Sequence, residues 1–385
     1  MSKMEITNKI IYLDNASTTS VYEEVLNSYV EVSKNHNGNS SSIHQKGMDA
    51  SRILERGREQ ILSLLNVKST HDCIFVSGAT ESNNLAIKGV AFNYQNRGKH
   101  IITTVIEHPS VLNAFKQLER LFGFEVTYLK VNEEGKISID ELKKSLRKDT
   151  ILVSIMAVNN EVGTVQPINE VAEVLKNYPK TYFHVDAVQA VGKINIPYEK
   201  IDLITFTSHK IHGLKGTGCL IKNKTISLVS LNSGGQQELG YRGGTVDVAG
   251  AVAFSKALRI ALERQKEATM YIKKLTSRIF EYLKNNDDLY KVNSNIEENP
   301  FLINFSLKNK KAAVIVEGLS RKGIMVSSVS ACNSKMEKVS YVVYEMYHDE
   351  SLAHNTIRVS PSEENTLEEI DIFIDELDKL VKDIR

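Results

Sequence analysis

Short apolar runs alternate with longer amphipathic segments through the first two thirds of this 385-residue chain. The runs have the length of β-strands, and the segments between them have the apolar spacing of helices. Strands are predicted at 73–77, 100–105, 125–131, 151–158, 181–186, 203–208 and 218–222, and helices at 81–97, 109–122, 138–147 and 168–178. This alternation indicates βαβ units and a mostly parallel sheet with helices on both faces. The chain is therefore predicted to be an α/β protein that binds its ligand at the carboxyl ends of the strands.

The last third of the chain has a different pattern. Residues 246–286 contain no proline and one glycine, which predicts one long helix or a broken pair of helices. Beyond them, strands are predicted at 290–294, 301–307, 324–327 and 356–360, and helices at 310–322 and 366–384. We predict a large domain at 16–258 and a smaller α+β domain formed by 1–15 and 259–385.

Composition excludes several classes of protein. The formal charge is 48 − 47 = +1, which provides no field that attracts nucleic acid or an anionic membrane. No apolar run reaches the roughly 18 residues that span a bilayer, and the first residues lack a secretory signal. Three cysteines are too few for a disulfide framework, so a reducing, cytoplasmic location is expected. The dispersed histidines have no metal-ligand spacing, and no metal site is predicted.

The three cysteines differ in their surroundings. Cys73 and Cys219 lie in apolar, strand-like runs, where a thiol usually behaves as a small buried hydrophobe. Cys332 lies in the polar, serine-rich stretch VSSVSACNSK. It is either a reactive thiol on a loop or an incidental residue of a turn.

A lysine follows the predicted strand 203–208, in the stretch FTSHKIHGLKGTG. Lys210 at this position is suited to forming a Schiff base with an aldehyde cofactor. The preceding Thr207, Ser208 and His209 are suited to binding the phosphate of that cofactor. The alternative is a surface lysine at the junction of a strand and a turn.

An acid ends the apolar strand in FHVDAVQAVG. A carboxylate at that point needs a positive partner, and the pyridinium nitrogen of pyridoxal phosphate is one. Asp186 is the candidate for this contact, and Gln189 is placed to hydrogen-bond the phenolic oxygen of the same ring. A simple N-cap role for Asp186 is the alternative.

The stretch VSGATESNNLAIKG predicts a strand that ends where a helix begins. Free N–H groups at a helix N-terminus, together with a hydroxyl, form a phosphate site. Thr80, with Ala79 before it, is the candidate phosphate ligand. A role as an N-cap alone is the alternative for Thr80.

Together these motifs resemble the class V aminotransferases, a group of fold-type I enzymes that use pyridoxal 5'-phosphate. More narrowly, they resemble the NifS/IscS-type cysteine desulfurases. The resemblance extends in family order from about residue 11 to residue 360, and it implies a mostly parallel seven-stranded sheet in the large domain. The matching stretches are IYLDNASTT, GNSSSIHQKG, SGATESNNLAIKG, IEHPSVL, VNNEVGTVQPI, HVDAVQAVGK, SHKIHGLKGTG, YRGGTVDV, SSVSACNS and LAHNTIRVS.

The resemblance implies a role for each matching residue. Lys210 matches the lysine that bonds to the cofactor, Asp186 the partner of the ring nitrogen, and Gln189 the contact to the phenolic oxygen. His108 matches the histidine that stacks on the ring and transfers protons. Cys332 matches the nucleophile that takes up sulfur. The remaining matches are phosphate ligands at Thr80, Thr207 and His209, one from the neighbouring subunit at Thr245, and holders of the substrate carboxylate at Asn160 and Arg358.

The implied activity is the conversion of L-cysteine to L-alanine, with a persulfide formed on Cys332. The implied partners are a second copy of the chain, in a homodimer, and a sulfur acceptor for iron–sulfur cluster assembly or for thiolation of transfer RNA or a cofactor. Alternatives are a selenocysteine lyase, another lyase of this fold, or a low-activity scaffold for sulfur transfer.

The chain departs from the family pattern near the predicted cysteine loop. Val329 stands where the family usually has glycine, which should restrict the backbone there, and Asn333 stands where it usually has threonine or serine. These departures leave the predicted cofactor residues intact and put the motion of the loop and the turnover rate in doubt. The other departures are Ser40, Leu214, Gln236, Leu239 and residues 361–363.

Overall fold

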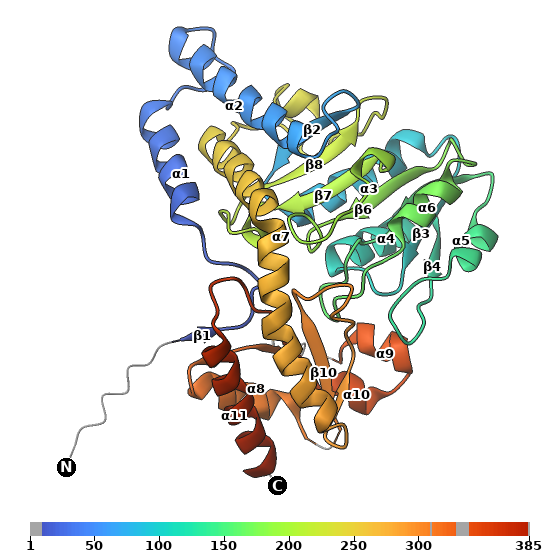
Figure 1. Ribbon diagram of the computed structural model, residues 1–385. Helices are drawn as coiled ribbons and strands as arrows, with labels where there is room; N and C mark the ends of the chain where they lie inside the picture. The colour runs from blue at the N-terminus through green and yellow to red at the C-terminus, as the bar shows by residue number, and fades with distance from the viewer. Residues whose placement is uncertain (1–9, 309, 329–338, 384–385) are drawn as a thin grey trace.

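A seven-stranded mixed sheet forms the centre of the larger part of the molecule. The computed structural model describes residues 10–308, 310–328 and 339–383 (Figure 1). All neighbours in the sheet pair in parallel except β8, which is antiparallel to both strands beside it. In spatial order the strands are β2 (His71–Val76), β8 (Gly218–Asn223), β7 (Leu203–Thr207), β6 (Tyr182–Asp186), β5 (Thr150–Ser154), β3 (His100–Thr104) and β4 (Glu125–Leu129).

Helices cover both faces of this sheet because successive strand residues point to opposite sides. Cys73 packs into one apolar cluster and Ile74 into the other. The face of Ile74 is covered by α3 (Ala79–Tyr94) and α4 (Pro109–Phe122). The face of Cys73 is covered by α1 (Glu23–Asn35), α2 (Gln45–Leu64), α5 (Ile139–Ser145), α6 (Ile168–Leu175) and the first half of α7 (Val248–Asn285).

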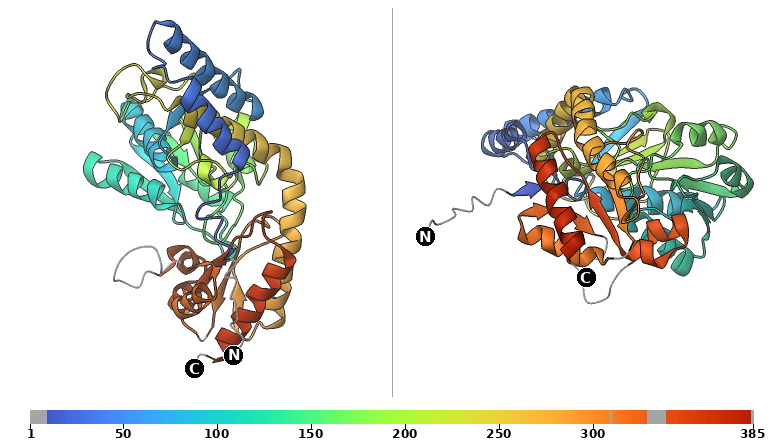
Figure 2. Two further views of the ribbon diagram at one scale, coloured as in Figure 1. Left: turned by 90° about the vertical axis from the view of Figure 1, so that its left-hand side faces the viewer. Right: turned by 60° about the horizontal axis from the view of Figure 1, so that its bottom comes forward.

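The second part of the molecule has its own apolar core. The long helix α7 contributes to both cores, with Leu258 buried in the first and Leu283 in the second (Figure 2). An antiparallel sheet carries the second core, in the order β12 (Ser327–Ser328), β13 (Thr356–Val359), β10 (Ile303–Leu307) and β9 (Tyr290–Val292). Its other elements are β1 (Ile11–Tyr12), paired with β11 (Ile324–Met325), and the helices α8 (Ala312–Arg321) and α11 (Leu367–Asp383).

Two short helices, α9 (Tyr341–Tyr347) and α10 (Glu350–His354), connect the two parts. Val342 and Met346 of α9 pack against Ile106 and Val162 of the larger part. In the part of the chain that the structure describes, no helix has the length and apolar character needed to cross a membrane.

The predicted fold class is confirmed, and the elements differ from prediction mainly at their ends. The predicted strand 151–158 is too long, because β5 ends at Ser154. Beyond that point Ile155 and Ala157 still donate backbone hydrogen bonds to residues of β6, but outside regular strand geometry. The long segment after residue 246 is one helix, not a broken pair. Helices α1, α2, α9 and α10 were not predicted.

Candidate functional site

A cavity of about 700 Å³ lies at the carboxyl ends of the strands, where the two parts of the molecule meet. Asp186 and Thr207 are the last residues of β6 and β7, and Thr80 lies in the first turn of α3. Most of the residues predicted from the sequence line this one cavity. They are Ala79, Thr80, His108, Asn160, Asp186, Gln189, Thr207, His209, Lys210 and Arg358.

Lys210 is held by the N-terminal segment of the chain. Its Nζ donates to the carbonyl oxygens of Ala16 and Ser17, both at 2.6 Å. Burial, assisted by the nearby charges of Arg358 and Lys193, lowers the pKa of Lys210 to about 7. A substantial share of the amine is therefore neutral near pH 7, which is the form that attacks a carbonyl carbon.

Asp186 is connected to the segment that carries His108. Asn83 of α3 donates through Nδ2 to Asp186 Oδ2 at 2.8 Å and to Ser110 Oγ at 2.9 Å. The backbone N–H of Val188 donates to Asp186 Oδ1 at 3.0 Å. Both Asp186 and Asn83 are buried. The carboxylate is thus oriented by two donors at the base of the cavity.

His108 caps the N-terminus of α4. Its Nδ1 accepts a hydrogen bond from the backbone N–H of Ser110 at 3.1 Å. Burial lowers the pKa of His108, so the neutral ring is favoured. Because Nδ1 is the acceptor, the ring proton lies on Nε2.

The N-terminus of α3 provides an anion site beside Thr80. Its first N–H groups have no intrahelical partners, and the N-cap residue Gly78 makes no side-chain cap. The backbone of β8 packs directly against this turn at Gly218. A Cβ at residue 218 would lie 2.7 Å from Gly78 Cα, so glycine is needed there. Thr207 also lines the cavity, but its hydroxyl already donates to the Thr217 carbonyl at 2.7 Å.

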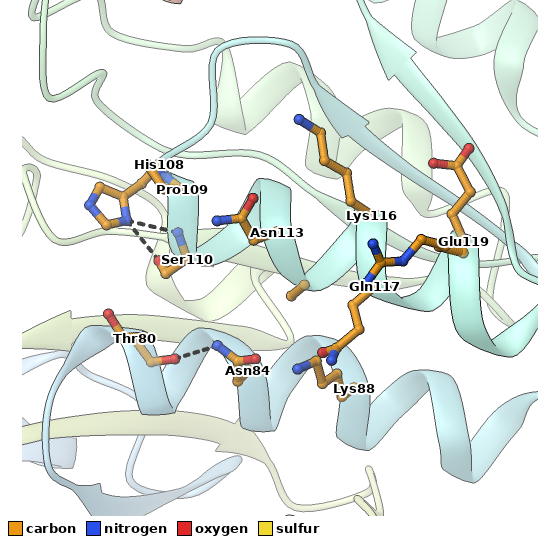
Figure 3. Close-up of a pocket in the computed structure, with 12 residues that line it drawn as sticks. Thr80, Asn84, Lys88, His108, Pro109, Ser110, Asn113, Lys116, Gln117 and Glu119 are labelled. Carbon is orange, nitrogen blue, oxygen red and sulfur yellow. Dashed lines mark hydrogen bonds between the residues drawn. The ribbon is translucent and has the colours of Figure 1, made fainter. Parts of the chain in front are cut away.

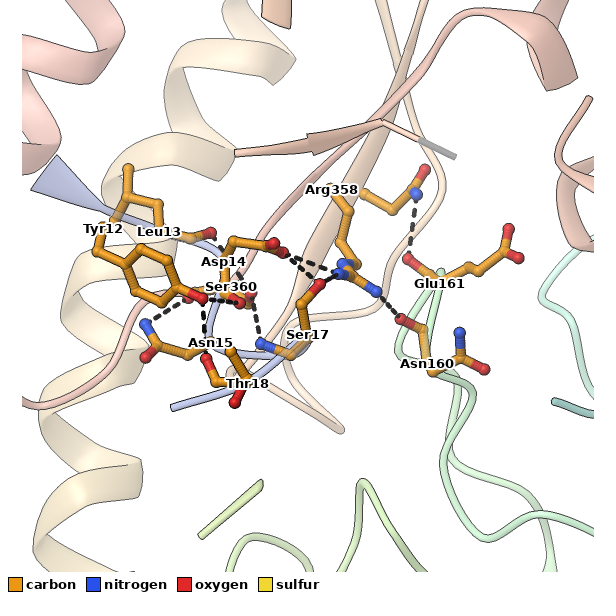
Figure 4. A network of polar contacts seen from close by, with 12 residues as sticks. Tyr12, Leu13, Asp14, Asn15, Ser17, Thr18, Asn160, Glu161, Arg358 and Ser360 are labelled. Atoms are coloured by element: carbon orange, nitrogen blue, oxygen red, sulfur yellow. Dashed lines mark hydrogen bonds and ion pairs between the residues drawn. The ribbon is translucent and has the colours of Figure 1, made fainter. Parts of the chain in front are cut away.

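Arg358 forms the opposite wall of the cavity (Figure 4). It lies on β13, and its guanidinium forms an ion pair with Asp14 at 2.8 Å. It also donates through Nη1 to the backbone carbonyl of Asn160 at 2.8 Å. The side-chain oxygen Oδ1 of Asn160 is buried and has no hydrogen-bond partner within the described residues. A ligand with a carboxylate and an amine fits this wall.

A second groove, of about 820 Å³, leads away from the cavity between α3 and α4 (Figure 3). It shares Thr80 and His108 with the cavity. Lys88, Lys116 and Glu119 lie farther along the groove. The cavity is therefore open to solvent along α3 and α4.

One predicted site residue, Thr245, does not line this cavity, and another lies outside the described residues. Thr245 lines an adjoining cavity, together with Glu238 and Asp247, and this cavity shares Ser77 and Gly216 with the first. Cys332 lies outside the described residues, as do Val329 and Asn333. Ser327, the next-to-last described residue before that segment, pairs with Arg358 across β12 and β13.

Sequence reasoning missed three residues that hold the site together. Asp14 and Ser17 contact Arg358, and Asn83 contacts Asp186. All three lie inside stretches that match the family, IYLDNASTT and SGATESNNLAIKG. The motifs were therefore visible, but the partner of each side chain was not.

The chain is similar to class V aminotransferases over nearly its whole length. The family model described as Aminotransferase class-V matches residues 11–373. A "NifS/IcsS protein homolog" from Lactobacillus delbrueckii subsp. bulgaricus is 41% identical over 376 residues, which cover 96% of this chain and 97% of the relative. "Cysteine desulfurase IscS" of Dictyoglomus turgidum is 40% identical over 378 residues, which cover 97% of this chain and 95% of the relative. The solved structure of a NifS-like protein, 35% identical, aligns with a TM-score of 0.90 over 98% of this chain and 100% of the other.

Proposed function

This chain belongs to the class V aminotransferases and is a pyridoxal phosphate-dependent cysteine desulfurase of the NifS/IscS type, and we propose that the cavity residues and Cys332 carry out its reaction. The observation that supports the residue roles most directly is the Lys210 amine, whose pKa is lowered to about 7, inside a cavity that also contains Asp186, His108 and Arg358.

The cavity fits the cofactor in three respects. Lys210 Nζ is suited to the covalent bond, the Asp186 carboxylate to the ring nitrogen, and the N-terminus of α3 beside Thr80 to the phosphate. Ala79, Thr207, His209 and Gln189 are proposed as further contacts. When bound, the cofactor supplies an electron sink that stabilises negative charge at the substrate Cα.

Lys210 and His108 are proposed to move protons. With the cofactor and substrate bound, Lys210 Nζ would take the proton from the substrate Cα. His108 exchanges a proton with the substrate thiol at Nε2. Arg358 and Asn160 bind the substrate carboxylate and so hold the Cα–H bond toward Lys210.

Cys332 is proposed to receive the sulfur. Its thiolate attacks the substrate sulfur, so that an S–S bond forms and the C–S bond breaks. The electron pair of the broken bond stays on the carbon fragment, which takes up protons and leaves as L-alanine. The sum is L-cysteine plus thiol giving L-alanine plus persulfide, and no external oxidant is required. The persulfide then passes its outer sulfur to an acceptor thiol.

The partners and boundaries are proposed on the same basis. Thr245 lies outside the cavity of its own chain, which supports a homodimer in which it contacts the phosphate of the neighbouring site. Acceptors are a cluster scaffold or a thiolation enzyme for transfer RNA or a cofactor, in the cytoplasm. The proposed domains remain 16–258, and 1–15 with 259–385. Light scattering that gives the mass of a monomer would contradict the dimer.

The test compares cysteine turnover by the wild type, Cys332→Ala and the matched control Cys73→Ala, with a reductant present. Cys73 is buried in the core and lies away from the site. We expect alanine and sulfide from the wild type and the control. Cys332→Ala should retain the cofactor colour and bind cysteine, but release sulfide at least about a hundredfold more slowly, because its nucleophile is lost.

The outcomes separate the alternatives. Equal sulfide release by Cys332→Ala and the wild type would remove Cys332 from the reaction. Faster turnover of selenocysteine than of cysteine, independent of Cys332, would indicate a selenocysteine lyase. Protein that stays colourless after incubation with pyridoxal phosphate would indicate a scaffold.

A further inference from the structure

Three separate segments meet at the guanidinium of Arg358 (Figure 4). Nη1 donates to the Asn160 carbonyl, and Nη2 donates to Asp14 Oδ1 at 2.8 Å and to Ser17 Oγ at 2.5 Å. A guanidinium has five N–H donors, so Nε–H and one N–H of Nη1 are left. Nε is buried and has no partner among the described residues. Part of the donor capacity of Arg358 is thus unused within the described residues.

Asp14 provides the negative charge that the buried guanidinium of Arg358 requires. The side chains of Arg358 and Asp14 are only 11% and 20% exposed. A guanidinium so removed from water is costly unless an anion is close to it. Asp14 therefore offsets the cost of burying the guanidinium charge and orients Arg358 before any substrate carboxylate arrives.

Ser17 contacts residues on two sides of the cavity, Arg358 and Lys210. Its hydroxyl donates to Asp14 Oδ1 at 2.9 Å and accepts from Arg358. Its backbone carbonyl accepts from Lys210 Nζ. Ser17 thus contacts both Arg358, the proposed ligand of the substrate carboxylate, and Lys210, the proposed base.

The segment around Ser17 is itself anchored to both parts of the molecule. Tyr12 donates through its hydroxyl to the Thr18 carbonyl at 2.9 Å, and Asn15 Nδ2 donates to the Ser360 carbonyl at 3.0 Å. Thr19 Oγ1 donates to the carbonyl of His209, next to Lys210, at 3.0 Å. The separation between Lys210 and Arg358 is therefore set by a short, well-anchored length of backbone.

We propose that Asp14 and Ser17 are positioning residues that hold Arg358 for the α-carboxylate of the substrate, at a distance from Lys210 suited to an α-amino acid. The proposal rests on the proposed function of the cavity. It assigns to these two side chains the preference for amines that carry an adjacent carboxylate over amines that lack one.

The test measures binding and turnover of two thiol amines by Asp14→Asn and Ser17→Ala holoenzymes. L-cysteine has the carboxylate and cysteamine lacks it. For Asp14→Asn, which removes the charge but keeps the shape, we expect the spectroscopic Kd and the KM for L-cysteine to rise about ten- to a hundredfold, as loss of a charge-assisted contact predicts. Ser17→Ala should raise them about threefold to tenfold. The Kd for cysteamine should stay within about twofold of the wild type in both.

Ser20→Ala is the matched control. Ser20 lies three residues from Ser17, and its hydroxyl contacts Glu364 and His212 rather than Arg358. It should leave both dissociation constants unchanged. All three variants should contain as much cofactor per chain as the wild type.

Two results would overturn the proposal. An unchanged Kd for L-cysteine in Asp14→Asn would show that Asp14 does not position Arg358. Equal losses for L-cysteine and cysteamine would indicate general damage to the site. Failure of the proposed function is a different result, because the wild type itself would then not turn over L-cysteine.

Discussion

The two walls of the cavity are built in different ways. One, the cofactor wall, consists of Thr80, His108, Asp186 and Lys210. The other, the carboxylate wall, consists of Asp14, Ser17, Asn160 and Arg358.

The cofactor wall follows from the strand ends of one sheet. Asp186 ends β6, and Lys210 lies just beyond β7. Because neighbouring parallel strands end at the same edge, these side chains converge once the sheet forms. The carboxylate wall instead joins residues far apart in the chain, since Asp14 and Arg358 are separated by 344 positions. The comparison teaches that the position of the first wall is fixed by the large sheet, while the second wall depends on how the two parts of the molecule meet.

The largest expected effect comes from the cofactor wall. Lys210→Ala removes the amine that we propose bonds to the cofactor and takes the Cα proton, and kcat should fall at least about a thousandfold. Borohydride treatment followed by peptide mass spectrometry should label residue 210 in the wild type only. Lys224→Ala, a surface lysine variant, should behave as the wild type does. Labelling at another lysine would break the assignment.

A change in the carboxylate wall should leave the cofactor wall intact. Arg358→Lys keeps the charge but loses the planar fork, so the KM for L-cysteine should rise roughly thirty- to a hundredfold. The cofactor absorbance and the labelling of Lys210 should be unchanged, as steady-state kinetics and spectra will show. Loss of the cofactor from this variant would mean that the two walls are not separable.

In the cofactor-free protein, the pH dependence of the free energy of unfolding tests the environment of Lys210 in the cofactor wall. The pKa of Lys210 is about 7 in the folded chain, against an ordinary value of 10.5. Between these values the unfolded chain binds more protons, so this lysine makes stability rise with pH. Relative to Lys210→Met, the wild type should gain about 2 kcal/mol of unfolding free energy between pH 7 and pH 9. Urea unfolding at each pH measures this, and parallel curves for the two proteins would contradict it.

Much of the fold was predictable because its elements are locally consistent. The seven strands and the helices between them have strong periodic patterns. Helix α4 also has the residues typical of helix ends, with Pro109 in its first turn and Gly123, at φ 67°, as its C-cap. Helix α1 was missed because it buries little, mainly Val25 and Val32. With so few apolar positions, the helical periodicity of this segment is too weak to predict a helix from the sequence.

Most of the residues predicted for the site line one cavity, but the contacts among them could not be predicted from the sequence. Lys210 and Asp186 follow strands, and that local signal marked them. Asn83 was missed since an amide within a helix reads as an ordinary polar residue until its neighbour on β6 is known. Asp14 was missed because its partner comes from the other end of the chain.

The sequence by itself determined most of the elements, the family and most of the groups that line the cavity, because these depend on local periodicity and on motifs of a few residues. The tertiary structure alone decided the environment of those groups. Burial and the approach of Arg358 lower the pKa of Lys210, and Asp14 with Ser17 orients Arg358. Desolvation and pairwise electrostatics depend on distances in space, and spacing along the chain does not specify them.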